Sequence, residues 1–174
     1  MTDPEQPQHE PGVPAQPAQP AQPGQPGQPG EDVRPVVVGV DGSENSKRAL
    51  AWAARYAALT GTPLRVIAVW ELPAGYGWTL PIPSDWDPEA DTKQLLEREV
   101  KEVLGSELPA SVSFSLLQGP PAKVLVEVSR DASAVVVGSR GRGEFAGLLL
   151  GSVSAFVTTH AHCPVVVVRD GTEE

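Results

Sequence analysis

The sequence is poor in cysteine, in aromatic side chains and in long apolar runs. Cysteine occurs once in the 174 residues, as Cys163, and aromatic residues make up 5% of the chain. A single cysteine excludes a disulfide framework within one chain and is typical of a reducing compartment. No apolar run approaches the length of about 18 residues that suggests a membrane-spanning helix, and the N-terminus has no signal-like apolar segment. These absences predict a cytoplasmic protein that makes no membrane contact.

Positive charge is also scarce. Lys and Arg number 13 against 22 Asp and Glu, so the formal net charge is −9 and the sequence pI is about 4.8. Proteins that bind nucleic acids without sequence specificity usually present a basic face to the phosphate backbone. The charge balance argues against that class, and we expect no nucleic-acid partner.

The first 33 residues differ in composition from the rest. They contain the repetitive stretch QPAQPAQPGQPGQPG and few large apolar side chains, so they have too little apolar surface to offset the entropy of ordering them. We expect a disordered tail over residues 1–33, one domain over 34–170 and a short C-terminal tail over 171–174. The N-terminal tail could be a solvated spacer or a ligand for aromatic-lined grooves.

From Pro35 onward, short apolar runs alternate with stretches of helical periodicity. The runs are predicted to be strands and the periodic stretches helices. The predicted strands are 36–40, 64–70, 112–116, 134–137 and 165–168. The predicted helices contain 50–57 and cover 89–104, 121–129 and 152–161. This order predicts an α/β fold, a five-stranded parallel sheet with helices on both faces.

The carboxyl ends of the predicted strands are where a ligand is expected, because parallel sheets bind ligands there, at the point where strand order reverses. The positions to search follow Val40, Val69 and Val137. The long irregular segment 71–88, with Trp78 and Trp86, is a further candidate because such long loops are often lids or binding segments. The alternative is that it only covers apolar surface beside the second strand.

A glycine-rich segment follows the fourth predicted strand. It reads Gly138-Ser139-Arg140-Gly141, then nine residues, then Gly151-Ser152 at the start of the last helix. Glycine can take positive φ and lets a ligand approach the backbone closely. Arg140 and Arg142 supply cations suited to phosphate oxygens, and the helix start supplies free N–H groups and the positive end of the helix dipole. The segment predicts a phosphate site, although it matches neither a P-loop nor the dinucleotide GxGxxG motif.

This spacing of Gly-x-x-Gly, nine residues and Gly-Ser resembles the nucleotide signature of the ATP-binding universal stress proteins. The similarity covers about residues 34–170 and includes VGVDGS at 38–43, VVGSRG at 136–141 and HCPVVVV at 162–168. It implies a Rossmann-like fold similar to that of the adenine nucleotide alpha hydrolases. It also implies that the protein binds ATP, with Mg²⁺ or Mn²⁺.

The same resemblance implies roles for individual residues. Asp41 would be the acid on the ribose or metal side, Gly39 and Val40 would border the adenine, and Val69 would pack on it. The ribose and phosphates would be held by Gly138, Arg140, Gly141, Gly151, Ser152 and Val153. Two alternatives stay open, because Asp41 could cap the first helix and Val69 could belong simply to the core.

The last predicted strand, Val165 to Val168, is a candidate dimer contact. Members of the family commonly dimerise through this strand, and an apolar edge strand without protection invites pairing with another chain. We therefore expect a homodimer.

The resemblance implies a nucleotide-dependent regulatory module of the stress response with slow or no hydrolysis. Apart from Asp41 and Glu144, no residue near the glycine segment is an evident base. A weak ATPase activity, or autophosphorylation at Ser152 or Ser154, is compatible with these residues. Two other classes stay open: a dimeric scaffold that binds no nucleotide, and an ATP-using enzyme such as a nucleotidyl transferase, whose SGGxDS-type motif is absent after the first strand.

Overall fold

The computed structural model describes residues 33–72, 86–143 and 149–169. The predicted tails, apart from Val33, lie outside the described residues. So do most of the long irregular segment, including Trp78, and residues 144–148 of the glycine-rich segment.

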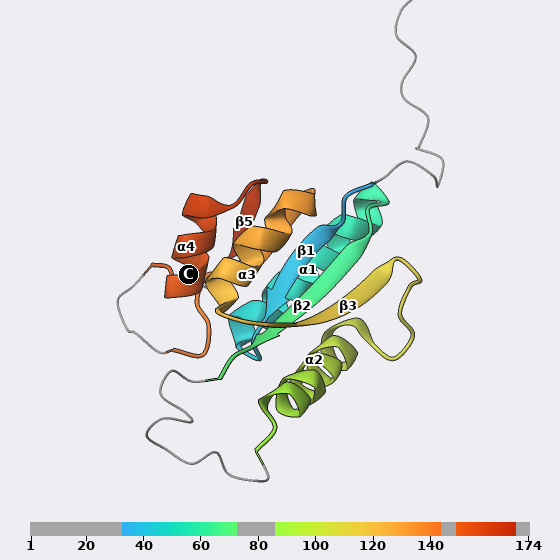
Figure 1. Cartoon of the computed structure of the whole chain (residues 1–174). Helices are drawn as coiled ribbons and strands as arrows, with labels where there is room; N and C mark the ends of the chain where they lie inside the picture. Colours follow the sequence, from blue (N-terminus) through green and yellow to red (C-terminus); the bar gives the residue numbers. More distant parts are fainter. Residues whose placement is uncertain (1–32, 73–85, 144–148, 170–174) are drawn as a thin grey trace, which may run out of the picture. The chain divides into compact units, whose positions relative to one another are not determined.

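Five strands and four α-helices alternate along the described chain, as predicted (Figure 1). The strands are β1 (Val36–Val40), β2 (Leu64–Trp70), β3 (Val112–Gln118), β4 (Ala134–Gly138) and β5 (Val165–Val168). The helices are α1 (Glu44–Thr60), α2 (Pro88–Leu104), α3 (Pro121–Val128) and α4 (Ser152–His160), with a 3-10 turn, η1, at Ser129–Asp131. None of these helices combines the length and the apolar character needed to cross a membrane.

The sheet is parallel and its strand order is β3-β2-β1-β4-β5. The chain starts in the middle at β1, builds outward through β2 to β3, and then crosses back to β4 and β5. Strand order therefore reverses between β1 and β4. Val36 pairs with Leu64 on one side and with Ala134 on the other, so the carboxyl ends of β1, β2 and β4 lie close together at the reversal point.

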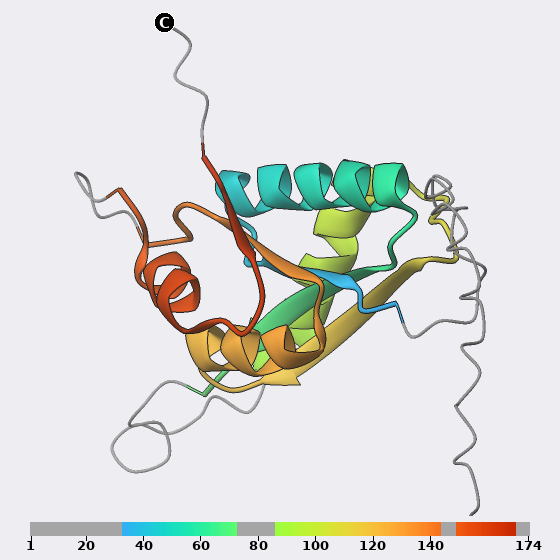
Figure 2. The ribbon, with the colours of Figure 1, turned by 90° about the horizontal axis from the view of Figure 1, so that it is seen from above.

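Two helices cover each face of the sheet (Figure 2). Alternate residues of β1, Val36, Val38 and Val40, pack with α1 and α2, whereas Val37 packs in the cluster formed by α3, α4 and the other face. Gly39 lies on this second face, because side chains alternate along a strand. A Cβ atom on Gly39 would be 3.2 Å from Leu125 Cδ1 of α3, so the missing side chain lets Leu125 approach β1 closely.

The helix starts differ in how they are capped. Ser43 Oγ accepts a hydrogen bond from Ser46 N at 3.2 Å and caps α1, and Asp87 Oδ1 accepts one from Ala90 N at 2.9 Å and caps α2. The N-cap of α4 is Gly151, which provides no side-chain cap. The first backbone N–H groups of α4 are therefore left without a side-chain acceptor.

Candidate functional site

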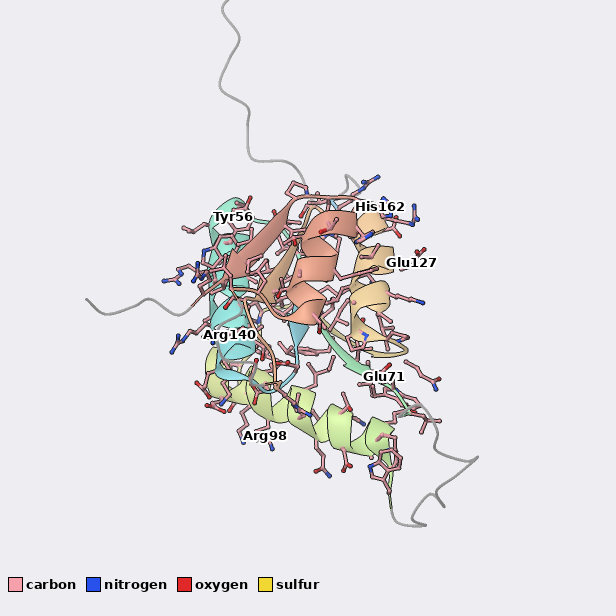
Figure 3. The ribbon with its side chains drawn as sticks, turned by 90° about the vertical axis from the view of Figure 1, so that its left-hand side faces the viewer. Tyr56, Glu71, Arg98, Glu127, Arg140 and His162 are labelled. Carbon is pink, nitrogen blue, oxygen red and sulfur yellow. The ribbon has the colours of Figure 1, made fainter. Side chains whose placement is uncertain are left out.

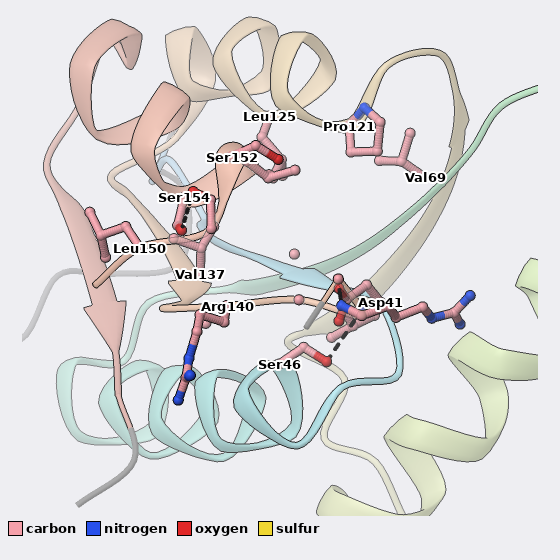
Figure 4. A pocket seen from close by; sticks show the side chains of 18 of the residues that line it. Asp41, Ser46, Val69, Pro121, Leu125, Val137, Arg140, Leu150, Ser152 and Ser154 are labelled. Carbon is pink, nitrogen blue, oxygen red and sulfur yellow. Dashed lines mark hydrogen bonds between the residues drawn. The ribbon is translucent and has the colours of Figure 1, made fainter. Parts of the chain in front are cut away.

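A cavity of about 580 Å³ lies at the carboxyl ends of β1, β2 and β4 (Figure 4). Its volume is within the range of small-molecule pockets, about 300–1,000 Å³. All ten predicted site residues line it, namely Gly39, Val40, Asp41, Val69, Gly138, Arg140, Gly141, Gly151, Ser152 and Val153. The structure thus brings together residues that are more than 100 positions apart in the sequence.

One end of the cavity is apolar. It is formed by Ile67 and Val69 of β2 with Pro121 and Leu125 of α3, and Gly39 borders it on β1. The sequence reasoning did not include Ile67, Pro121 or Leu125. Pro121 lies three residues after the end of β3, and this position beyond a strand end was the available signal for this edge of the sheet.

A polar part of the cavity lining is built by the start of α4. Ser152 is exposed at the first position of the helix, and Gly151 N donates a hydrogen bond to Ser139 O at 2.8 Å. Ser154 Oγ lies 2.8 Å from Ser139 O and 3.0 Å from Gly151 O, and Ser154 is buried. The hydroxyl of Ser154 therefore holds the loop together, whereas the uncapped amides and the positive dipole end of α4 are suited to an anion.

The loop glycines are needed for space rather than for unusual backbone angles. Among the described residues, positive φ occurs at Gly42, Gly61, Gly105 and Gly119. Gly138 and Gly141 therefore do not use the positive φ that glycine permits. A Cβ atom on Gly138 would be 2.7 Å from the carbonyl carbon of Asn45, and one on Gly141 would collide with Asp41 Oδ2.

Asp41 joins the start of α1 to the glycine-rich loop. Its Oδ1 accepts hydrogen bonds from Ser43 N at 3.0 Å and from Ser43 Oγ at 2.7 Å, and its Oδ2 accepts one from Arg142 N at 3.3 Å. Ser43, not Asp41, is the N-cap of α1. The carboxylate therefore braces the capping residue and the loop at the same time.

The two arginines lie at the rim of the cavity. In Figure 4 the Arg140 side chain extends away from Ser152 and Leu125. The Arg142 guanidinium lies beside Gly42, with Nη2 3.0 Å from the position of a Cβ atom there. In this structure the polar end is therefore formed by backbone amides more than by the guanidinium groups that the sequence suggested.

A buried carboxylate lies between α1 and α2, outside the cavity lining. Glu99 is 1% exposed, and its Oε2 has no hydrogen-bond partner among the described residues. Its Oε1 is 4.0 Å from Lys47 Nζ, which is closer to Glu102 at 2.9 Å and to Glu44 at 3.2 Å, and 3.9 Å from Arg98 Nε. Burial raises the pKa of Glu99, and the attraction of Lys47 only partly opposes this.

Replacement of this carboxylate by an amide, Glu99→Gln, is expected to stabilise the fold at alkaline pH. The raised pKa means that the wild-type fold holds a proton more tightly than the unfolded chain, whose Glu titrates near 4.5. The stability that this proton provides is complete below pH 4.5 and is lost as pH rises through the folded pKa. We expect a gain of about 1 kcal/mol in the free energy of unfolding at pH 8 and no gain near pH 4.

Urea denaturation of both proteins at the two pH values measures this difference. The exposed Glu97, two positions before Glu99 on the same helix, offers Glu97→Gln as the matched control. A loss of stability in Glu99→Gln at pH 8 would show that attraction by Lys47 outweighs the cost of burial.

The part of the chain that forms the sheet and the cavity also matches a known protein family. The model of the universal stress protein family matches residues 32–169. The chain belongs to the universal stress protein family. The match covers all five strands, all four helices and the whole described cavity.

Curated relatives support the same membership. This universal stress protein is 39% identical over 139 residues to universal stress protein Rv2005c of Mycobacterium tuberculosis. The matched region covers 77% of this chain and 47% of that protein. It is 33% identical over 141 residues to universal stress protein Rv2623 of the same species, covering 78% and 47%. The chain spans about half the length of the curated relatives it matches.

Solved structures share the fold. A universal stress protein in complex with cAMP is 26% identical, with a TM-score of 0.55 over 78% of this chain and 96% of that chain. The universal stress protein UspA from Lactobacillus plantarum, at 19% identity, has a TM-score of 0.58 over 78% and 98%.

Proposed function

We propose that this universal stress protein binds ATP at the carboxyl edge of its sheet and acts as a nucleotide-dependent regulatory module in the stress response. The observation that carries the proposal is the polarity of one cavity. Apolar side chains of β2 and α3 suit an adenine, and the uncapped start of α4 in the same cavity suits phosphates. The solved relative that holds cAMP supports an adenine nucleotide as the ligand class.

The lining residues divide between the two ends of the nucleotide. Gly39, Val40 and Val69 would border the adenine, with Leu125 and Pro121 closing that end. The ribose and phosphates would contact Gly138, Arg140, Gly141, Gly151, Ser152 and Val153. The partner-binding state of the protein would then depend on whether the cavity is filled.

A divalent cation, Mg²⁺ or Mn²⁺, would accompany the phosphates. Asp41 is the single carboxylate among the described lining residues. Mg²⁺ is usually held by one or two carboxylates together with phosphate oxygens and waters, so one acid is sufficient when the nucleotide supplies the rest. The three hydrogen bonds that Asp41 accepts leave part of its lone-pair capacity free. When bound, the cation would neutralise phosphate charge.

Substitution of this acid, Asp41→Asn, is expected to weaken ATP binding at least about tenfold in the presence of Mg²⁺. The change removes the charge that favours the cation, and it can place an amide N–H₂ opposite the N–H of Arg142. Calorimetric titration with and without Mg²⁺ measures both effects. Asp131→Asn, at an exposed position in η1, is the control. An unchanged Mg²⁺ dependence in Asp41→Asn would mean that Asp41 does not hold the cation.

Hydrolysis is proposed to be slow or absent. Asp41 already accepts hydrogen bonds from Ser43 and from the N–H of Arg142, and Glu144, the other acid that the sequence suggested, lies outside the described residues. For autophosphorylation, Ser152 is exposed whereas Ser154 is buried and hydrogen-bonded. Ser152 is therefore the acceptor that we favour if the reaction occurs.

The decisive experiment is calorimetric titration of nucleotide-free protein with ATP and Mg²⁺, followed by AMP and cAMP as competitors. We expect one saturable site per chain. An absence of binding would contradict the proposal and would favour the alternative of a nucleotide-independent scaffold.

The open edge of the sheet at β5 supports the proposed homodimer. Figure 3 views the molecule from this side, with β5 between α1, which carries Tyr56, and α4. All four valines of β5 are only half-buried, and the described residues provide no strand beyond it. We place the dimer in the cytoplasm. Sedimentation equilibrium is expected to give twice the chain mass, and a monomer at high concentration would contradict this.

A further inference from the structure

A second cavity, of about 520 Å³, lies between α2 and the edge strand β3. It shares no lining residue with the nucleotide cavity. Its floor is apolar and consists of Leu96, Val100, Leu108, Phe114 and Leu116. Figure 1 shows β3 at the edge of the sheet, with α2 running along this side. The volume is that of a small-molecule pocket.

Phe114, near the middle of β3, is only partly covered by α2. Phe114 pairs with Val66 of β2 and therefore lies on the face that α1 and α2 cover. Its neighbours on that face, Val112 and Leu116, pack against the core, yet Phe114 is 43% exposed and Leu108 is 36% exposed. α2 thus leaves two large apolar side chains in contact with solvent inside a concave site.

Two lysines on α2 flank this apolar floor. Lys93 and Lys101 line the cavity two helical turns apart, and no carboxylate lies within 4 Å of either ammonium group among the described residues. Glu97 lies between the two lysines on the same helix face. It too has no ion-pair partner among the described residues. The helix dipole favours Lys101 in the last turn of α2, but it does not favour Lys93 near the start.

We propose that this cavity binds a small amphiphilic anion, an unbranched hydrocarbon chain that ends in a carboxylate. The chain would cover Phe114 and Leu108, and the carboxylate would pair with Lys93 or Lys101. The single charge of Glu97 between the lysines leaves a net positive rim on a chain whose formal charge is −9. Apolar surface beside an unpaired cation has the chemistry that recognises such a ligand.

Titration of the full chain with decanoate, in the presence of saturating ATP, tests the proposal. We expect one saturable site per chain, with affinity rising about fourfold for each methylene from octanoate to dodecanoate. The double variant Lys93→Gln, Lys101→Gln is expected to bind decanoate about fivefold more weakly and to bind decanol, which has no charge, unchanged. Lys123→Gln, on the exposed surface of α3, is the matched control.

Other outcomes would overturn the proposal. These are the absence of saturable binding, equal decanoate affinity in the double lysine variant and the wild type, and decanoate binding that persists in Phe114→Ser. The lysine variants change only exposed side chains, so their result does not depend on Phe114→Ser folding. Conversion of a dimer to a monomer by Phe114→Ser would instead identify this face as a contact between copies of the chain. None of these outcomes bears on ATP binding, which has its own titration.

Discussion

Ser152→Asp is expected to weaken ATP binding about a hundredfold or more without harming the fold. Ser152 is exposed at the first position of α4, where the N-cap Gly151 provides no side chain. A carboxylate at this position is favourable for the helix by about 0.3–1 kcal/mol, but it occupies the place proposed for a phosphate. Like charges in direct contact cost several kcal/mol, so the affinity should fall roughly a hundredfold or more.

The matched control for this variant is Ser152→Asn, which is close in size to Asp but uncharged. It should retain most of the affinity while differing from Ser152→Asp by one charge. Calorimetric titration measures binding, and thermal unfolding checks that both variants are as stable as the wild type. Equal affinities of the Asp and Asn variants would place the phosphates elsewhere and would contradict the assignment of this end of the cavity.

Gly138→Ala is expected to destabilise the protein by about 1–3 kcal/mol, the usual cost of overpacking. The new Cβ atom would be 2.7 Å from the carbonyl carbon of Asn45, 2.8 Å from its Cβ atom and 2.9 Å from its carbonyl oxygen. These contacts are mainly with backbone at the buried start of α1, so no side-chain rotation relieves them.

Gly39→Ala is the matched control because Gly39 also lies near the end of a central strand. Its Cβ atom would meet only the flexible side chain of Leu125, at 3.2 Å and beyond, and we expect a cost below about 1 kcal/mol. Urea denaturation measures both changes. A loss of ATP affinity in Gly138→Ala at unchanged stability would mean that Gly138 serves ligand approach and not packing. Because Gly138→Ala is expected to destabilise the fold, a loss of ATP affinity in this variant is informative only together with the stability measurement.

The course of the chain was predictable from local patterns. Runs of β-branched residues such as Val36–Val40, and the glycines and prolines that end the helices, mark the strands and helices because each signal acts over a few residues. The position of the cavity was also predictable, since the resemblance carried by the spacing of Gly138, Gly141 and Gly151 named residues that all line it.

Contacts between distant segments were not predictable from the sequence. Leu125 reaches the apolar end of the cavity only because α3 packs on the face where Gly39 has no side chain. The requirement for glycine at 138 comes from Asn45, 93 positions earlier in the sequence. The burial of Glu99 follows from the packing of α2 against α1, and helical periodicity gives only a weak hint of it, because Glu99 is three residues after Leu96 on the apolar face.

The lack of a capping side chain at the start of α4 is expected to lower the stability of this helix in the ligand-free protein. A helix of nine residues without a capping side chain has little intrinsic stability, and α4 leads within five residues to β5. A phosphate on its first amides would complete the helix as a capping residue does, so the nucleotide would act as a removable part of the fold. Amide hydrogen exchange in α4 and β5 would then slow as ATP is added, and the order of the C-terminal part of the domain would follow the ATP concentration.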